Sequence, residues 1–413
     1  MDSHHLLSAC YFFAMQAVIV LIAFNIKGAF SPPHCPLSSA TLASSGQNHL
    51  QSVWFYEHVF EHQPARLRVL TEKDGAAPLK SNMPRKKREI TIVSGTTRDR
   101  LAAVESTAMS WSGAMSTAVH VRDEADIPSV YQQVQQLHAR VEVLGRCRLD
   151  IVLVREDGPE GFTRNLYPVN GMRNVAWRMA TTKLIILLDA DFKPSPRMHE
   201  RLTEDEVAYQ ELERKATQEH HVFVVPAFEF MPSYRPRLHG NSLVGWRSNL
   251  SIPETKEDLK KKWERGIVDC FHCPYSPAGH EPTNFRKFFD PSITTPYSIP
   301  YVEGFEPYLL VGRDSTPKYD ERFRGYGKNK ISHIYSCATG HGMHFQVLPN
   351  AFVFEIPHPQ SHSRTYWEGR ATHRIVGLYR RFKTEVQQLK TQRERMALNT
   401  SPNEREHNVS MTG

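Results

Sequence analysis

Residues 181–195 read TTKLIILLDADFKPS, and they place two acidic residues at the end of an apolar run. The run at 184–188 consists of Leu and Ile only, which predicts a short buried β-strand. Asp189 and Asp191 follow directly, and side chains two positions apart point to the same side of an extended chain. Because two like charges this close repel each other, the pair predicts a bound cation or a shared proton.

Strand-like and helix-like segments alternate before this run. The segments with strand character are 90–95, 115–123 and 149–156, and those with helical character are 98–112, 129–144 and 169–181. This alternation predicts an α/β fold whose parallel sheet is covered by helices on both faces. In open sheets of this kind ligands bind beyond the carboxyl ends of the strands, which is where Asp189 and Asp191 fall.

The second half of the chain has fewer long periodic runs. Further strands are expected at 221–230, 308–314 and 345–358, and helices at 203–219, 327–341 and 373–396. The stretch 231–300 is rich in Pro, Tyr, His and basic residues. Long irregular regions near the end of a sheet commonly carry binding residues, so this stretch either contacts an acceptor or forms a packed irregular subdomain.

The composition is that of a globular protein. The chain has 413 residues, of which 40% are hydrophobic and 23% charged, and this excludes a disordered or fibrous class. The net charge is +7 and the isoelectric point about 9.0. A basic surface favours anionic partners such as nucleotide phosphates or an acidic polymer, although mild basicity also serves solubility alone.

The segment 6–26 carries no charged side chain and has the length of one membrane span. A cleaved signal peptide is the alternative, but such peptides have a shorter apolar region and a basic front, whereas MDSHH contains no Lys or Arg. Lys27 gives no support to a lumenal orientation under the positive-inside rule. That orientation relies on other features, among them the glycosylation sequons at Asn249, Asn399 and Asn408.

Two further motifs each leave two readings open. The basic run from Arg85 to Arg88 is either a solvated hinge or a site for a secretory-pathway protease. The pair Cys270 and Cys273 is either half of a zinc site or a structural feature such as a disulfide. No second CxxC follows, and an oxidising lumen favours the disulfide.

Three chemistries place Asp-x-Asp after an apolar strand. In a sugar-nucleotide transferase the carboxylates hold Mg²⁺ or Mn²⁺, and the cation neutralises the leaving diphosphate. In a haloacid-dehalogenase-type phosphatase Thr or Val would stand two positions after the second Asp, where this chain has Lys193. In the third case the two residues only cap a turn or the next helix.

Seven segments, taken in order, resemble glycosyltransferase family 49, which includes LARGE-type enzymes and β-1,4-glucuronyltransferases. They are ITIVSGTTRDRL, YPVNGMRNVA, LLDADFKPS, GHEPTNF, GFEPYLL, YDERFRGYGKNKISH and LPNAFVFEIPH. The resemblance implies a GT-A fold with a Rossmann-like mixed sheet, a UDP-sugar donor, Mn²⁺ (or Mg²⁺) dependence and inversion at the anomeric carbon. It also implies a single-pass type II protein of the Golgi membrane. The expected parts are a cytoplasmic tail at 1–5, an anchor at 6–26, a stem at 27–87, a catalytic domain at 88–385 and a basic, disordered tail at 386–413.

The resemblance also carries roles onto single residues. Asp189 and Asp191 match the Asp-x-Asp motif that meets the metal and the donor. Arg173 and Asn174 match an Arg-Asn pair that lines the nucleotide pocket, although Arg173 also fits an exposed ion pair. Glu306 matches the Glu of an EP pair and is a candidate catalytic base or acceptor-orienting group.

The last matched segments are less clear. Asp320 and Glu321 match a DER motif and fit a catalytic role or a helix cap equally well. Glu355 stands where the family carries a His that serves as third metal ligand, and His358 follows three residues later. Glu355 is a hard oxygen ligand and is a candidate for that position, and His358 is the alternative.

Together these features predict a membrane-anchored, metal-dependent inverting glycosyltransferase that acts on a glycan or glycoprotein acceptor. The rival hypothesis is a lectin-like member that binds sugar without transferring it, and Glu355 in the place of His favours that rival. No nucleic-acid partner is expected.

Overall fold

The computed structural model describes residues 66–157, 166–234, 237–239, 242–244, 251–356 and 371–399. All of these residues lie within one compact unit, which spans residues 57–413. None of the described helices is long and apolar enough to cross a membrane, and the anchor predicted at 6–26 lies outside the described residues.

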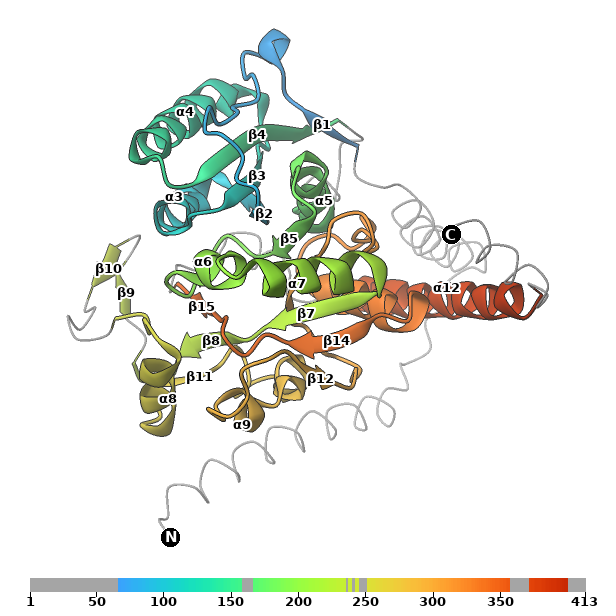
Figure 1. Cartoon of the computed structure of the whole chain (residues 1–413). Coiled ribbons are helices and arrows are strands. Elements are labelled where there is room, and N and C mark those ends of the chain that lie inside the picture. Colours follow the sequence, from blue (N-terminus) through green and yellow to red (C-terminus); the bar gives the residue numbers. More distant parts are fainter. Residues whose placement is uncertain are drawn as a thin grey trace, which may run out of the picture. The chain divides into compact units, whose positions relative to one another are not determined.

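A large mixed sheet forms the centre of the described unit (Figure 1). Its nine strands, in spatial order, are β1 (Leu67–Val69), β4 (Arg148–Glu156), β3 (Ala114–His120), β2 (Ile90–Thr97), β5 (Leu184–Leu187), β13 (Tyr308–Gly312), β7 (His221–Val225), β14 (His344–Val347) and β12 (Tyr297–Ile299). The four strands β4, β3, β2 and β5 are parallel, as the alternation of strands and helices predicted.

The sheet is mixed because β13 runs against its neighbours. Leu309 lies opposite Leu187, the last residue of β5, so β13 begins at the carboxyl end of β5 and runs back through the sheet. The edge strands β1 and β12 are also antiparallel to their neighbours. The prediction of a purely parallel sheet was therefore wrong, whereas the prediction of a mixed sheet, which the family resemblance implied, was confirmed.

Helices cover both faces of the sheet, and the strand residues alternate between the two layers. Ile90 and Ile92 of β2 pack with α3 (Leu101–Ser110), α4 (Ile127–Leu144) and α7 (Glu206–Gln218). Val93 faces the other way. It joins α5 (Val169–Met179) and α10 (Asn329–Tyr335) in a second core cluster. Burial on both sides explains why these strands are almost entirely apolar.

A second, four-stranded sheet grows from the carboxyl end of the first. Its strands are β11 (Val268–Cys270), β8 (Ala227–Phe230), β15 (Val353–Glu355) and β6 (Phe192–Pro194). Three strands of the large sheet, β5, β7 and β14, each continue into a strand of the small one, β6, β8 and β15. Between β7 and β8 the chain passes from the large sheet to the small one at Pro226. Proline has no backbone N–H, so Pro226 cannot donate a hydrogen bond that would continue the pairing of β7.

The remaining elements lie around these sheets. They are α6 (Met198–Thr203), the hairpin of β9 (Arg237–His239) and β10 (Ser242–Val244), α8 (Lys256–Glu264), α9 (Phe285–Phe288), a π-helical turn at Ser336–Gly340 and α12 (Ala371–Asn399). Cys270 and Cys273 form a disulfide, the alternative that an oxidising compartment favoured.

The chain on either side of the body also packs onto it. β1 lies within the segment 27–87 and pairs with β4, and Leu70 and Ala76 are fully buried. α12 runs to Asn399, and its first half is buried at Leu378 and Phe382. The ordered body thus includes residues beyond both ends of 88–385.

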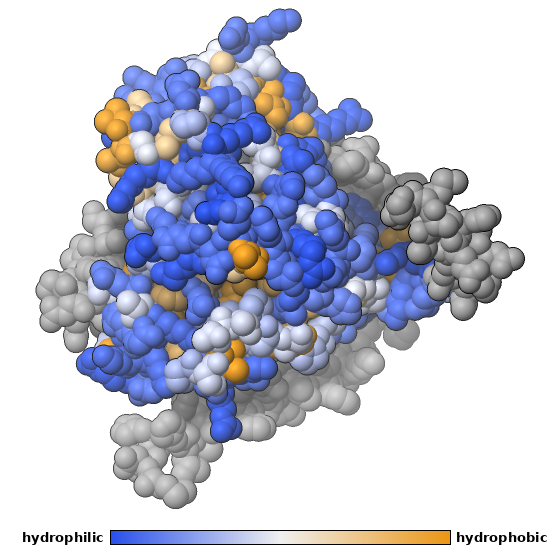
Figure 2. Space-filling view, viewed as in Figure 1, coloured by the Kyte–Doolittle hydropathy of each residue, from blue (hydrophilic) through white to orange (hydrophobic). Residues whose placement is uncertain are grey.

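One face of the molecule is mostly hydrophilic (Figure 2). Its apolar spots are small and separate, and one of them lies over α4, where Val143 and Leu144 are exposed. Scattered apolar side chains of this kind are ordinary on a soluble surface and indicate no docking patch.

Candidate active site

The order of the strands places a topological switch point at the carboxyl ends of β2 and β5. From β2 the chain moves outward through β3 to β4, and then returns through α5 to form β5 on the other side of β2. The connections after β2 and after β5 therefore diverge, and this is the switch point at which open α/β sheets bind nucleotides. Asp189 and Asp191 lie at this point, in the link between β5 and β6.

Asp189 is held by three donors from three different elements. Arg173 of α5 donates from a guanidinium nitrogen 2.5 Å from Oδ1. Lys330 of α10 lies 3.1 Å from Oδ2 through its Nζ. The hydroxyl of Tyr308, at the start of β13, donates to the same Oδ2 at 3.0 Å. Both carboxylate oxygens are thus engaged by protein groups.

The charges around Asp189 fix its ionisation. Burial alone would raise its pKa, but the cations of Arg173 and Lys330 outweigh burial and hold the pKa well below its ordinary value. Burial raises the pKa of Tyr308 well above its usual value, and the negative charge of Asp189 adds to this shift. The site therefore holds a permanent carboxylate and a neutral phenol at physiological pH.

Glu306 joins this cluster through Lys330. Its Oε1 lies 3.7 Å from Lys330 Nζ, and 37% of its side chain is exposed. Its backbone N–H donates to the carbonyl of Gly279 at 2.9 Å, which ties the segment GFEP to the segment GHEP. The structure thus brings together three residues that the sequence predicted separately: Arg173, Asp189 and Glu306.

Asp191 lies beside the strand that carries Glu355. In the pairing of β15 with β6, Glu355 is opposite Phe192, and the N–H of Ile356 donates to the carbonyl of Asp191 at 2.7 Å. The last strand therefore runs back past the Asp-x-Asp motif. Glu355 is 7% exposed, and His358 lies outside the described residues.

These residues fit a hard cation in the kind of donor that they offer. Carboxylate oxygens such as those of Asp191 and Glu355 suit Mg²⁺ or Mn²⁺. Among the described residues, however, no three His, Cys, Asp or Glu side chains gather closely enough to hold a metal ion. Asp189 in this arrangement accepts hydrogen bonds from Arg173, Lys330 and Tyr308.

Aromatic rings form one wall of the site. Phe192, directly after Asp191, packs on Tyr308 with ring centroids 4.4 Å apart and on Phe271 at 4.8 Å. His280 lies edge-on to Phe271 at 5.4 Å, and burial lowers its pKa well below the ordinary value. This packing fixes the link that follows the Asp-x-Asp motif.

Two candidate residues are used elsewhere. Asn174 binds the backbone of Tyr319 in both directions, donating to its carbonyl at 2.8 Å and accepting from its N–H at 3.0 Å. Asp320 accepts from the guanidinium of Arg322 at 2.6 Å, and Arg322 also pairs with Glu385 of α12 at 2.5 Å. Neither side chain bonds to the Asp189 cluster.

Lys330 and Tyr308 are functional candidates that the sequence analysis missed. Both lie in segments that resemble the family, GFEPYLL and YGKNKISH, but no local pattern marks them. Their contacts with Asp189 span 141 and 119 residues of chain. Comparing each matched segment with the family could have drawn attention to Lys330 and Tyr308, whereas hydrophobic periodicity and motif spacing could not.

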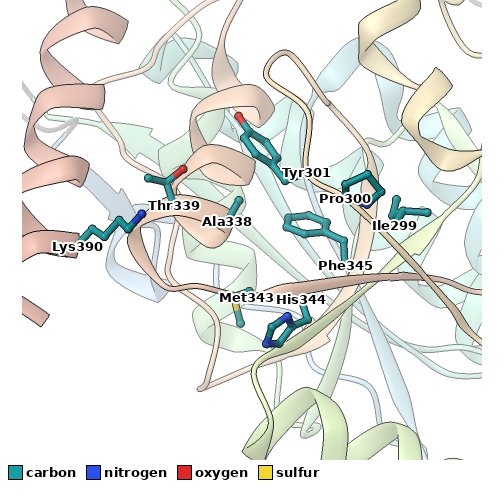
Figure 3. Close-up of a pocket in the computed structure, with 9 residues that line it drawn as sticks. All are labelled: Ile299, Pro300, Tyr301, Ala338, Thr339, Met343, His344, Phe345 and Lys390. Carbon is teal, nitrogen blue, oxygen red and sulfur yellow. The ribbon is translucent and has the colours of Figure 1, made fainter. Parts of the chain in front are cut away.

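A separate hollow of about 330 Å³ lies away from this site (Figure 3). It is lined by Ile299, Pro300, Tyr301, Ala338, Thr339, Met343, His344, Phe345 and Lys390. His344 opens β14, which runs in the same direction as β7 and β5. The hollow therefore adjoins the amino ends of these strands, at the edge of the sheet opposite to Asp189.

Comparison with known proteins identifies the family of the chain. A family model described as "Glycosyl-transferase for dystroglycan" matches residues 152–390, more than half of the chain. The chain belongs to glycosyltransferase family 49. The matched range contains Arg173, the Asp-x-Asp motif, Lys330 and Glu355.

Curated relatives support the same assignment. The xylosyl- and glucuronyltransferase LARGE1 of Mus musculus is 31% identical over 301 residues, which is 73% of this chain and 35% of that protein. LARGE1 of Homo sapiens gives the same figures, and LARGE2s of Danio rerio is 33% identical over 66% of this chain and 32% of its own length. The family 49 chain thus spans about a third of the length of the curated relatives it matches.

Solved structures show weaker similarity. GalNAc-T7 with UDP, GalNAc and Mn²⁺ aligns with a TM-score of 0.37 and 11% identity over 81% of this chain and 57% of that one. TarS of S. aureus with UDP-GlcNAc aligns with a TM-score of 0.35 and 9% identity over 77% of each chain.

Proposed function

We propose that this family 49 chain is a membrane-anchored, metal-dependent inverting glycosyltransferase that moves a sugar from a UDP-sugar to a glycan or glycoprotein. One observation carries the proposal. Asp189, at the switch point of the sheet, is fixed by Arg173 and Lys330. Lys330 in turn reaches Glu306. A candidate donor-binding carboxylate and a candidate base therefore both lie next to one ammonium group.

A divalent cation fits between the donor and the carboxylates of Asp191 and Glu355. Once bound, it would neutralise the negative charge that develops on the leaving diphosphate. Asp191 directly precedes β6, and its carbonyl accepts from the N–H of Ile356, the residue after Glu355, so the two chain segments are adjacent. Arg173, whose side chain is 9% exposed, keeps Asp189 ionised and oriented next to them.

Glu306 is the candidate base. Its side chain is 37% exposed and so is accessible to an incoming hydroxyl group. In a single displacement it would accept the proton of the acceptor hydroxyl as the new glycosidic bond forms and the bond to the diphosphate breaks. One displacement inverts the anomeric carbon, and this matches the stereochemistry that the family resemblance implies.

The relatives and the sequence support a choice of donor and of location. The relatives are named xylosyl- and glucuronyltransferases, so UDP-xylose and UDP-glucuronate are the first donors to test. The apolar segment 6–26 would anchor the protein in the Golgi membrane with the catalytic part in the lumen. Glycan on Asn249, Asn399 or Asn408 would support that topology.

The test is donor hydrolysis and transfer by the purified chain without its first 56 residues. We expect Mn²⁺-dependent release of UDP from at least one member of a panel of UDP-sugars, and faster release when a glycan acceptor is present. Sugar binding with no turnover of any donor would instead favour the lectin-like alternative.

Asp191→Asn tests the metal in this proposal. Loss of one ligand charge should reduce turnover by about 100-fold or more and weaken Mn²⁺ binding, measured by calorimetry, while the melting temperature stays close to that of the wild type. Asp314→Asn is the matched control, because Asp314 is 77% exposed and pairs with the neighbouring Arg313 on the surface. Equal activity of the Asp191 variant and the control would contradict the metal role.

A further inference from the structure

Lys330 occupies the centre of the polar cluster, although the sequence predicted no role for it. Its side chain is 9% exposed, and it comes from α10. Its Nζ lies 4.1 Å from the ring centroid of Tyr308. Burying an ammonium is costly unless it is paired and hydrogen-bonded, so its presence here calls for a reason.

The contacts of Lys330 connect two carboxylates with different expected roles. Nζ lies 3.1 Å from Asp189 Oδ2, and 3.0 Å from the oxygen of Tyr308. On its other side it lies 3.7 Å from Glu306 Oε1. The ammonium therefore stands between the Asp-x-Asp motif and the candidate base.

Support of Asp189 alone does not account for this arrangement. Arg173 and Tyr308 already donate to both oxygens of Asp189, so the carboxylate would remain bonded without Lys330. An ammonium has three N–H donors. Two of them are used in the hydrogen bonds to Asp189 and Tyr308, and the third faces Glu306 from beyond hydrogen-bond distance.

We propose that Lys330 is a positioning residue for the transfer step: it holds Glu306 and Asp189 at a fixed separation. The proposal rests on the function proposed above, because it assumes that Glu306 meets the acceptor and that the Asp-x-Asp motif meets the donor. Without the ammonium, Glu306 loses its counter-charge and Asp189 keeps its other donors. The loss should therefore affect the rate of transfer and leave donor binding almost unchanged.

Lys330→Met is the test, since Met fills a similar volume without the charge. We expect kcat for transfer to fall by about 100-fold, the size of effect that misplacement of a reacting group by 1 Å can produce. The dissociation constant of UDP with Mn²⁺, measured by calorimetry, should stay within about threefold of the wild type, and KM for the donor should follow it. Lys330→Arg should recover part of the rate, because it restores the charge with a different shape.

Lys328→Met is the matched control. Lys328 belongs to the same GKNK segment but lies over the ring of Tyr379, 5.3 Å from its centroid. Among the described residues, the cation that contacts both Asp189 and Glu306 is Lys330 and not Lys328, so the Lys328 variant should keep the wild-type kcat. Near-ultraviolet circular dichroism and the melting temperature of all three variants check that the fold is intact.

Three results would overturn the proposal. If Lys330→Met keeps the wild-type kcat, the residue does not position the reaction. If UDP binding falls in parallel with kcat, Lys330 acts on the diphosphate. If Lys330→Met melts far below the wild type and Lys330→Arg does not recover activity, its role is structural. Absence of turnover in the wild-type chain would instead count against the proposed function.

Discussion

Arg173 and Asn174 are neighbours in the chain but serve different parts of the molecule. Successive residues of an α-helix point about 100° apart, so a pair read together in sequence need not share a site. Arg173 reaches Asp189, whereas Asn174 reaches the backbone of Tyr319 and the side chain of Glu321. The resemblance to the family identified both positions, and the geometry gives them separate tasks.

Asn174→Ala should therefore affect stability and not catalysis. The substitution leaves the N–H and the carbonyl of buried Tyr319 without these partners, at a cost of about 2–4 kcal/mol in the free energy of unfolding. Urea denaturation measures this loss, and donor KM should stay within about threefold. Asn350→Ala is a control, because Asn350 is exposed and its side chain donates a long hydrogen bond, 3.4 Å to the carbonyl of Thr294. A higher donor KM with an unchanged free energy of unfolding would instead support the prediction that Asn174 lines the nucleotide pocket.

At the scale of elements, hydrophobic periodicity correctly predicted the alternating strands and helices between residues 90 and 188, but not β1, β6 or α6. The expected strand 90–95 and helix 129–144 correspond to β2 (Ile90–Thr97) and α4 (Ile127–Leu144). The single strand expected at 221–230 is instead two, β7 and β8, which belong to different sheets. An apolar run looks the same whether it stays in one sheet or changes sheet, and only Pro226 signals the break.

The close contact of β2 with α5 links element packing to the site. Gly95 lies under α5, and a Cβ at this position would come within 2.8 Å of Met172 Cβ and 3.1 Å of the backbone nitrogen of Arg173. Gly95→Ala should push α5 outward and misplace Arg173, so kcat/KM should fall and the free energy of unfolding should decrease by about 1–3 kcal/mol.

Gly145→Ala is the control for Gly95→Ala, because it introduces backbone strain without any clash in packing. Gly145 ends α4 with φ of +60°, and no atom lies within 4 Å of an added Cβ. The free energy of unfolding of this variant should fall by about 1–2 kcal/mol, because Ala is disfavoured in the left-handed conformation, and kcat/KM should stay at the wild-type value. Equal kcat/KM in both variants would show that the position of α5 does not control the site.

At the scale of the whole molecule, the site depends on contacts that one sequence does not specify. Asp189 and Asp191 were predicted from a local pattern, because a strand end and two carboxylates are adjacent in the chain. The cluster around them also requires β13 and α10, which come more than 100 residues later. Their place is set by the pairing of β13 with β5 and β7, and by the packing of α10 on the second face of the sheet.

Buried histidines make the stability of the whole fold depend on pH. Burial lowers the pKa of His199 and of His333 to about 4. Their side chains are 2% and 1% exposed. In the unfolded chain each would titrate near about 6.5. Between pH 6.5 and 4 the unfolded state therefore binds more protons, and stability is lost as pH falls through this window, by about 1.4 kcal/mol per pH unit for each residue.

The two histidines together should lower the free energy of unfolding by about 3 kcal/mol between pH 7.5 and 5.5, measured by urea denaturation. His333→Gln should remove about half of this dependence, because Gln can still donate to the carbonyl of Pro317, which accepts from His333 at 2.8 Å, but does not titrate. An unchanged free energy of unfolding at pH 5.5 would mean that these histidines are protonated in the folded state. Equal pH dependence in the variant and the wild type would assign the loss of stability to other groups.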